Sequence, residues 1–297
     1  MNDFKRQTLI KTISFMSLFV AINVICSFLT TLVPLISIVL IIFLPLTSAV
    51  VEVNCKDRWF PIYAFATIGL SVVVSLSSID FTLFYIIPSI FTGYIFGLFS
   101  KRKLPSMFAI FVATSIQTVL SYLFIPLLHL ITGLDVIAKI AEIIKISNIF
   151  LFRTSILLLF FLVALIQVIL SFIVVDNELR KFGQKTEHKF GNTTFATYSG
   201  LITIVLSIAF CFFYLPICYL LIGISFYFAV FVVIGQSQNK NTICLILDGV
   251  SFVVGLVLYA ALNHLIHGGK DFVLFLITPG LICIISMISS FLKKSPQ

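Results

Sequence analysis

The sequence predicts an all-α fold, a polytopic bundle of transmembrane helices with about ten spans. Hydrophobic residues make up 60% of the 297 residues and charged residues only 10%, whereas about a quarter of the residues in soluble domains are charged. Apolar runs of about 20 residues recur along the chain, and a helix of that length crosses a hydrocarbon layer about 30 Å thick. The basic residues gather in alternate loops between these runs, as is typical of polytopic membrane proteins.

Each apolar run is expected to form one helix. The ten runs cover residues 8–29, 35–53, 60–78, 81–99, 106–130, 149–175, 195–213, 217–235, 243–262 and 272–292. Only Tyr214, Leu215 and Pro216 separate the seventh run from the eighth, so one long kinked helix is the alternative there. Two spans are favoured, because a single crossing would move Lys240 to the opposite side from residues 180–189.

The Lys and Arg residues orient the predicted bundle. With the N-terminus inside, 15 of the 19 lie in cytoplasmic loops or termini, and a basic excess marks the cytoplasmic side. Both termini are therefore predicted to be cytoplasmic, and the net charge of +8 is attributed to orientation and not to a nucleic-acid surface. The four outside or near the outer interface are Lys139, Lys145, Arg153 and Lys270.

The longest polar stretch divides the chain into two membrane regions. Residues 177–194 are predicted to form a cytoplasmic linker between a six-span region, 1–176, and a four-span region, 195–297. The chain contains no P-loop and no polar segment long enough for a nucleotide-binding domain, so ATP-driven activity would need a partner chain. The apolar N-terminal run is too long for a signal peptide, and no small-residue cleavage site follows it.

No residue pattern for catalysis or for a cofactor is present. Ser-His-Asp, H-E-x-x-H and paired-carboxylate arrangements do not occur, so no enzymatic activity and no cofactor are expected. His264 and His267 lie three residues apart without a third ligand at helical spacing, so no metal site is predicted.

The segment between the fifth and sixth runs, Asp135–Asn148, is predicted to be an amphipathic helix. Its charged residues recur three or four apart while isoleucines fill the other side, and about 14 residues are too few to cross a bilayer. The helix could lie on the outer leaflet or cover an outward-facing pocket.

The fourth run combines a span, a close-packing pattern and a basic stop at Lys101–Lys103. Gly93 and Gly97 form a G-x-x-x-G pair, which lets a neighbouring helix approach the backbone. Glu52, near the end of the second run, is four residues from Lys56, and this spacing predicts an ion pair at the membrane boundary.

Ionisable residues inside the apolar runs are the first candidates for functional residues, because each costs roughly 2.5–3.5 kcal/mol at the centre of a membrane. Asp248 lies about six residues into the ninth run. It could be a polar partner within the bundle or a proton- or ion-coupling residue. Arg153 lies near the start of the sixth run, where its long side chain could reach the outer headgroups.

A polar stripe follows one face of the fifth run. Gln117, Ser121 and His129 share much of this face with Thr114, and Asn23 is a similar polar residue in the first run. These side chains could bind a solute in a water-accessible cavity, or they could hydrogen-bond to neighbouring helices.

Three segments of the front half carry a resemblance to a known family. They read FMSLFVAINVICSFL (15–29), LVPLISIVLIIFLPLTSAV (32–50) and FYIIPSIFTGYIFGLFSKRK (84–103), and they resemble the membrane-embedded S components of energy-coupling factor (ECF) transporters. The chain length and the C-terminal segments LIGISFYFAVFVVIG and LITPGLICIISMISSFLKK resemble the YybS-like family of uncharacterised bacterial membrane proteins, itself similar to S components.

The resemblance implies a function and a set of partners. It implies binding of a small, vitamin-like solute at the outer face of a bacterial cytoplasmic membrane protein, with transport powered by ECF ATPase subunits through a transmembrane coupling subunit. Ser17 and Ala21 stand at the spacing of the small-residue docking seam on the first helix of S components. Two alternatives stay open: a stand-alone secondary transporter of about ten helices with Asp248 as coupling residue, and a non-transporting membrane scaffold or regulatory protein.

Overall fold

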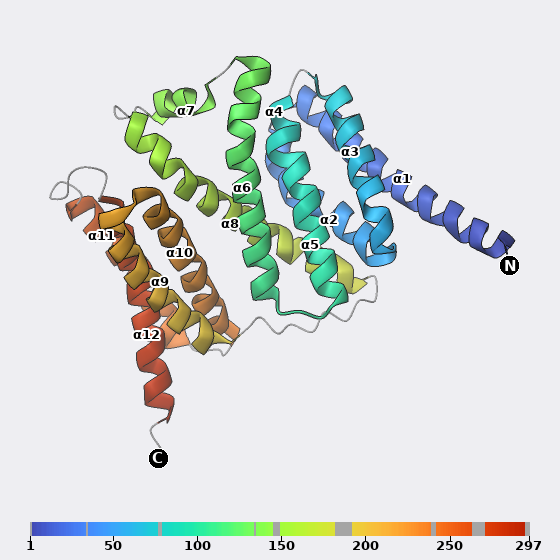
Figure 1. Ribbon diagram of the computed structural model, residues 1–297. Coiled ribbons are helices and arrows are strands. Elements are labelled where there is room, and N and C mark those ends of the chain that lie inside the picture. The colour runs from blue at the N-terminus through green and yellow to red at the C-terminus, as the bar shows by residue number, and fades with distance from the viewer. Residues whose placement is uncertain are drawn as a thin grey trace. The chain divides into compact units, whose positions relative to one another are not determined.

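The computed structural model describes residues 2–33, 35–76, 79–133, 135–144, 149–181, 192–238, 242–262 and 271–294. Every regular element in this part of the chain is helical (Figure 1). The helices are α1 (Asn2–Leu32), α2 (Ile36–Asn54), η1 (Asp57–Trp59), α3 (Phe60–Val74), α4 (Ile79–Phe81), η3 (Thr82–Ile86), α5 (Ile87–Lys101), α6 (Ser106–Thr132), α7 (Val136–Ile144), α8 (Ile149–Lys181), α9 (Thr193–Phe213), α10 (Leu215–Gln238), α11 (Thr242–Leu262), η4 (Asp271–Leu276) and α12 (Ile277–Lys294).

Eight helical segments of the described chain are long and apolar enough to cross a membrane. The two remaining predicted spans coincide with α2, whose apolar part is the shorter segment Val39–Asn54, and with α3, which has 15 residues. The prediction of an all-helical fold is confirmed for the described residues, and the eight long apolar helices are consistent with an integral membrane protein. The count of ten spans and the cytoplasmic position of both termini stay predictions.

The outside of the helices is apolar and much of their interior is polar. Phe213 is 84% exposed and Leu130 81% exposed, whereas Thr67, Ser71 and Ser48 are fully buried. Hydrocarbon accepts exposed apolar side chains at no cost, but polar groups in a membrane must find partners inside the protein. This distribution suits a protein surrounded by lipid.

Contacts divide the chain into two compact units. The first unit comprises Met1–Val136 and Val163–Lys189, and the second comprises Ile137–Leu162 and Phe190–Gln297. The division falls within α8. The units therefore differ from the predicted regions 1–176 and 195–297, because α7 and the first part of α8 group with α9–α12.

In the first unit, α2 and α5 pack side by side in the same direction. A Cβ atom added at Gly93 would lie 2.2 Å from the carbonyl oxygen of Pro45, and one added at Gly97 would lie 2.7 Å from Cβ of Glu52. Later residues of α2 thus face later residues of α5. This close packing is what the G-x-x-x-G spacing predicts, and the shared direction is what the second and fourth spans of an alternating bundle would have.

The helix before α5 changes its hydrogen-bond pattern ahead of a proline. The backbone N–H of Ile87 bonds to the carbonyl oxygen of Thr82, five residues back, so η3 is a π turn. Pro88 has no backbone N–H to donate, and a π turn is one way in which a helix passes such a residue without ending. The helical path from Ile79 to Lys101 is therefore continuous.

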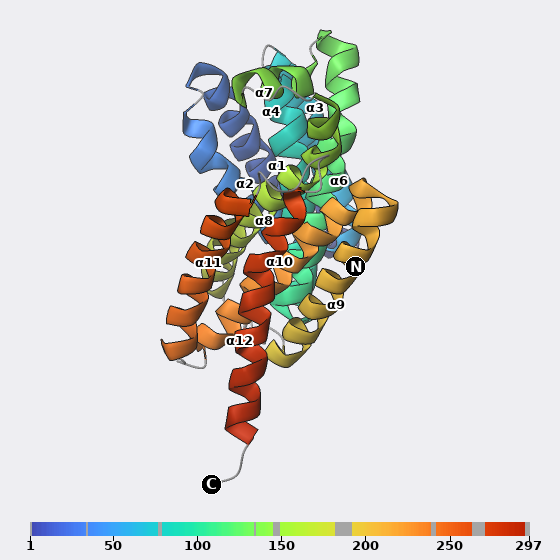
Figure 2. The ribbon, with the colours of Figure 1, turned by 90° about the vertical axis from the view of Figure 1, so that its left-hand side faces the viewer.

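In the second unit, α9 and α10 form an antiparallel pair (Figure 2). The Ser207 hydroxyl donates a hydrogen bond to the carbonyl oxygen of Cys218 at 3.1 Å, while Thr193 at the other end of α9 packs against Gly235. The prediction of two helices in place of one long kinked helix is confirmed.

The amphipathic segment forms the short helix α7. Its residue Ala141 is buried against Phe152 and Ile156 of α8, with Ile137 and Ile140 packed at the edge of the cluster. The last four residues of the predicted helix, 145–148, lie outside the described residues. The choice between an interfacial helix and a lid stays open.

Candidate functional site

Asp248 is an acidic side chain buried within the second unit. It lies on α11, is 3% exposed, and neither of its carboxylate oxygens has a hydrogen-bond partner among the described residues. Across the antiparallel packing of α11 and α12, it is within electrostatic range of the Cys283 thiol. A buried carboxylate is costly unless a proton, a cation or water compensates it.

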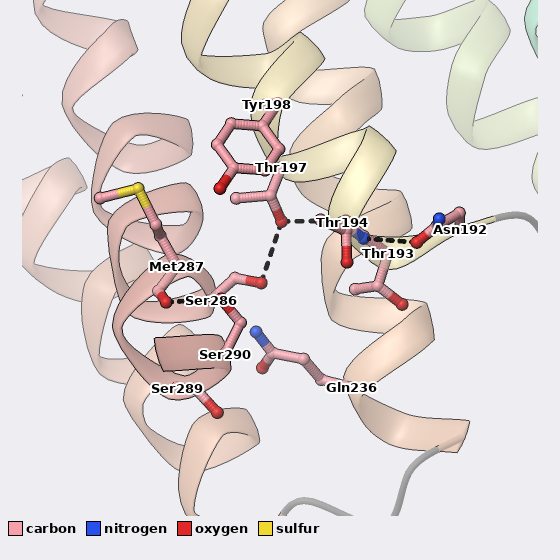
Figure 3. Close-up of a pocket in the computed structure, with 10 residues that line it drawn as sticks. All are labelled: Asn192, Thr193, Thr194, Thr197, Tyr198, Gln236, Ser286, Met287, Ser289 and Ser290. Carbon is pink, nitrogen blue, oxygen red and sulfur yellow. Dashed lines mark hydrogen bonds between the residues drawn. The ribbon is translucent and has the colours of Figure 1, made fainter. Parts of the chain in front are cut away.

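A polar pocket of about 290 Å³ lies in the same unit, between the start of α9 and the ends of α10 and α12 (Figure 3). The Thr197 hydroxyl donates to the carbonyl oxygen of Thr193 at 2.9 Å and shares a hydrogen bond of 3.0 Å with the hydroxyl of Ser286. The pocket wall is thus held together across α9 and α12. The lining residues are Asn192, Thr193, Thr194, Thr197, Tyr198, Gln236, Ser286, Met287, Ser289 and Ser290.

Gln236 contributes a buried side-chain amide to this pocket. It is only 5% exposed, and neither its amide nitrogen nor its amide oxygen has a partner among the described residues. In Figure 3 the amide group lies in the space between α9 and α12, next to Ser286 and Ser290. A primary amide offers two donors and one acceptor oxygen, and buried polar groups are normally hydrogen-bonded, so this amide is available to a ligand or to water.

Asp248 and the pocket both adjoin α12. Asp248 lies within electrostatic range of Cys283, and the pocket residues Ser286 and Met287 follow three and four positions later on that helix. Asp248 itself is not among the described residues that line the pocket.

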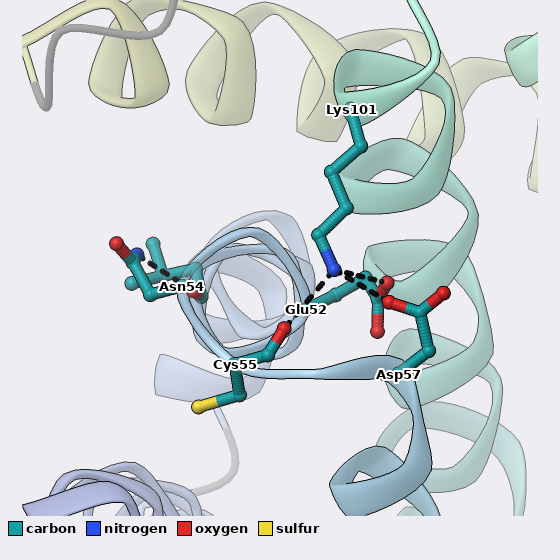
Figure 4. A network of polar contacts seen from close by, with 6 residues as sticks. Glu52, Asn54, Cys55, Asp57 and Lys101 are labelled. Carbon is teal, nitrogen blue, oxygen red and sulfur yellow. Dashed lines mark hydrogen bonds and ion pairs between the residues drawn. The ribbon is translucent and has the colours of Figure 1, made fainter. Parts of the chain in front are cut away.

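In the first unit, Lys101 joins the end of α5 to the end of α2 (Figure 4). Its ammonium nitrogen lies 2.9 Å from Oε1 of Glu52, 3.0 Å from the carbonyl oxygen of Cys55 and 2.7 Å from Oδ1 of Asp57. The three donors of the ammonium group thus meet three acceptors. The hydrogen bond from Lys101 keeps the pKa of Asp57 below its ordinary value, while burial raises the pKa of the Cys55 thiol.

The predicted pairing of Glu52 with Lys56 is wrong, since Glu52 pairs with Lys101 instead. The helix ends at Asn54 and Cys55 is extended, so Lys56 does not follow on the next turn. The side chain of Glu52 is fully buried and lies over Gly97, whose missing side chain leaves it room.

The polar stripe on α6 is partly used for helix packing. The amide nitrogen of Gln117 donates to the amide oxygen of Gln167 on α8 at 2.6 Å, and its own oxygen accepts from Thr92 on α5 at 3.5 Å. Ser121 is half-buried, and His129, near the end of the helix, is exposed. The stripe therefore does not gather its members around one pocket.

Asn23 takes part in a buried network of three helices. Its amide nitrogen donates to the Tyr63 hydroxyl at 2.7 Å, and that hydroxyl donates to Thr47 at 3.2 Å. The single hydrogen of the Thr47 hydroxyl is shared between the amide oxygen of Asn23 at 3.0 Å and the carbonyl oxygen of Leu44 at 2.8 Å. This closed ring ties α1, α2 and α3 together. The same ring uses the groups of Asn23 that a solute would need.

The remaining predicted residues lie on the outside. Arg153 of α8 is exposed, and its position near the outer headgroups stays a prediction. Ser17 and Ala21 are both exposed on α1, and the hydroxyl of Ser17 is satisfied within the helix by the carbonyl oxygen of Ile13 at 2.8 Å.

Gln236 and the serines of α12 were not among the residues predicted from the sequence. The spacing of Ser286, Ser289 and Ser290, at three and four residues, was the signal that could have placed hydroxyl groups on one face of the last helix. Comparisons with protein-family models, with curated proteins and with solved structures find no match for this chain. The described part of the chain is helical, has eight helices long and apolar enough to cross a membrane, and contains in its second unit a polar pocket and a buried carboxylate without a hydrogen-bond partner among the described residues.

Proposed function

We propose that this protein transports a small solute across a membrane and that Asp248 couples the movement to a proton or a cation. The observation that carries the proposal is the burial of this carboxylate in a membrane helix without a hydrogen-bond partner among the described residues. An ionisable group is costly to insert into a membrane helix, so such groups are rare there. Those that occur are typical of proton and ion pathways.

The chain offers a comparison with a carboxylate in a structural role. Glu52 is also fully buried, yet one of its oxygens is paired with Lys101 at 2.9 Å, and the pair joins two helices. Asp248 has no such partner among the described side chains, so it contributes no comparable link between helices. A group that exchanges a proton or a cation must be free to change its partner, and Asp248 meets that condition.

The experiment measures proton movement in proteoliposomes that contain the full chain and an internal pH dye. Xylitol, myo-inositol and gluconate are added outside in turn, and solute-dependent acidification or alkalinisation is recorded. We expect Asp248→Asn to abolish this signal, because the amide cannot exchange a proton. Asp80→Asn, which changes an exposed aspartate, is the matched control and should leave the signal intact.

Stability separates loss of coupling from loss of fold. Asp248→Asn removes an unpaired buried charge, so its thermal unfolding temperature should equal or exceed that of the parent chain. A folded Asp248→Asn protein that still moves protons with solute would exclude the coupling role.

A second candidate follows from the resemblance to S components. In that case the chain binds a vitamin-like solute and depends on ECF ATPase and coupling subunits in a bacterial cytoplasmic membrane. The supporting observation is that Ser17 and Ala21 lie exposed on α1, beside Leu18, which is 58% exposed. A partner helix could therefore approach α1 along this face.

Purification from cells that contain ECF subunits tests the second candidate. We expect the subunits to copurify with the parent chain and to be lost from Ala21→Phe, whose ring would block close approach. Leu18→Phe on the same helix is the control, because a large side chain already occupies that position. A protein that is always isolated alone, with no solute-dependent proton signal, would favour the scaffold alternative.

A further inference from the structure

We propose that the pocket between α9, α10 and α12 binds a small uncharged polyhydroxyl solute and that Gln236 is its principal hydrogen-bonding residue. The proposal deepens the proposed function by naming a class of solute. It rests on that function for the step from binding to transport, but not for binding itself.

The size of the pocket limits the ligand. Its volume of about 290 Å³ is just below the range of roughly 300–1,000 Å³ that ligand pockets cover. This is the space of roughly ten water molecules at about 30 Å³ each. A pentitol or a monosaccharide is of this size, whereas a nucleotide or a lipid is too large.

The lining residues determine the charge of the ligand. The lining residues that the structure describes contribute hydroxyl groups, two side-chain amides and one thioether, and they include no carboxylate, ammonium, guanidinium or imidazole group. Beside the buried amide of Gln236 an ion would lack a counter-charge among the described lining side chains, and burial of an unpaired charge is strongly unfavourable. An uncharged solute is therefore favoured over an anion or a cation.

The start of α9 is partly capped by its own side chain. A free helix N-terminus attracts anions through its unpaired N–H groups. Here the side chain of Asn192 already accepts the backbone N–H of Thr194 at 3.0 Å, so this donor is occupied. The opposite wall contains the last turns of α10 and α12, where carbonyl groups disfavour negative charge.

The arrangement of donors and acceptors suits hydroxyl groups of a ligand. A hydroxyl group both donates and accepts, and Gln236 presents an amide that can do both to a neighbouring atom. Neither the nitrogen nor the oxygen of this amide has a hydrogen-bond partner among the described residues, although Gln236 is only 5% exposed. On one side of the pocket, the hydrogen bond between Thr197 and Ser286 sets the separation of α9 and α12, and therefore the space that a ligand can occupy.

Thermal unfolding of the purified full chain in lipid nanodiscs tests the site, with xylitol and myo-inositol as uncharged probes and gluconate and glucosamine as charged probes. We expect the uncharged probes to raise the unfolding temperature of the parent chain with a saturable, low-millimolar dependence. Leucine has nearly the same volume as glutamine but offers no hydrogen bond. Gln236→Leu should therefore weaken binding at least tenfold, which is on the order of the affinity lost with one hydrogen bond to a buried group.

Two further variants control for folding and position. Gln238→Leu makes the same change two residues away on the same helix, at an exposed side chain that does not line the pocket, and should bind as the parent does. Ser290→Phe places a ring at the exposed edge of the pocket and should also prevent binding, without changing the buried amide.

Three results would overturn the inference. They are stabilisation by gluconate or glucosamine in place of the uncharged probes, equal affinity in Gln236→Leu, and a linear, non-saturating effect of polyols common to all variants, which is the general osmolyte response. Asp248→Asn separates this inference from the proposed function, because it should bind the probes but move no protons. Binding without any solute-dependent proton signal in the parent chain would refute coupled transport and leave the site standing.

Discussion

Substitution of Gly93 by alanine measures how closely α2 and α5 pack. The added Cβ atom would lie 2.2 Å from the carbonyl oxygen of Pro45 and 2.6 Å from Cβ of Ser48, and both contacts are far below van der Waals distance. One of these atoms belongs to the backbone, so a side-chain rotation cannot relieve the clash and the helices must separate.

The magnitude follows from two opposing effects. In an exposed helix, glycine to alanine stabilises by about 1 kcal/mol, whereas overpacking a well-packed interior costs about 1–3 kcal/mol or more. Because the clash at Gly93 involves a fixed backbone oxygen, we expect the upper end of that cost and a net loss of about 2 kcal/mol in the free energy of unfolding. The effect at Gly97 should be smaller, since two of its three close contacts are with the side chain of Glu52.

Denaturant unfolding of the purified chain in detergent, followed by circular dichroism, provides the assay. Gly69→Ala is the matched control, because no atom lies within 4 Å of a Cβ added there, in α3 of the same unit. It should be neutral or slightly stabilising. A Gly93→Ala protein as stable as Gly69→Ala would refute the close packing of α2 on α5.

Two further predictions concern polar contacts of the first unit. Lys101→Met leaves the fully buried Glu52 without its cation and should cost about 3 kcal/mol of unfolding free energy, most of it regained in the double variant with Glu52→Gln. Unfolding titrations of the parent chain, the two single variants and the double variant check this, and additive losses would contradict it. Tyr63→Phe opens the hydrogen-bonded ring with Asn23 and should cost about 1 kcal/mol of unfolding free energy, whereas Tyr122→Phe at an exposed position should cost nothing. Unfolding titrations of both variants test this, and equal stabilities would show that the ring contributes little.

The helices themselves could be predicted from the sequence because each depends on a local property. Hydropathy over about 20 residues and the placement of Lys and Arg located α9 and α10 as two helices, although only Tyr214 separates them in the structure. The G-x-x-x-G spacing of Gly93 and Gly97 likewise indicated a contact face. These features depend on residues that are close in sequence.

Partners could not be predicted, because they depend on which helices meet. The spacing of Glu52 and Lys56 suggested an ion pair within one helix, but the partner is Lys101, 49 residues away on a helix that packs against α2 through glycines. Gln117 similarly bonds to Gln167, 50 residues later. A periodic pattern identifies the face of a helix, but it does not identify the helix opposite.

Asp248 and Gln236 differ in whether the sequence alone could identify them as candidate functional residues. Asp248 could be singled out because a carboxylate inside an apolar run is rare, whatever surrounds it. Gln236 could not, because an amide near the end of a membrane helix is normally in contact with headgroups or water. Its burial comes from tertiary packing: Gly235 beside it lies against Thr193, and Thr197 and Ser286 are hydrogen-bonded in the same pocket. The pocket is therefore built from residue types that are ordinary for a helix end, and the proposed binding of a solute depends on the packing of α9 against α10 and α12.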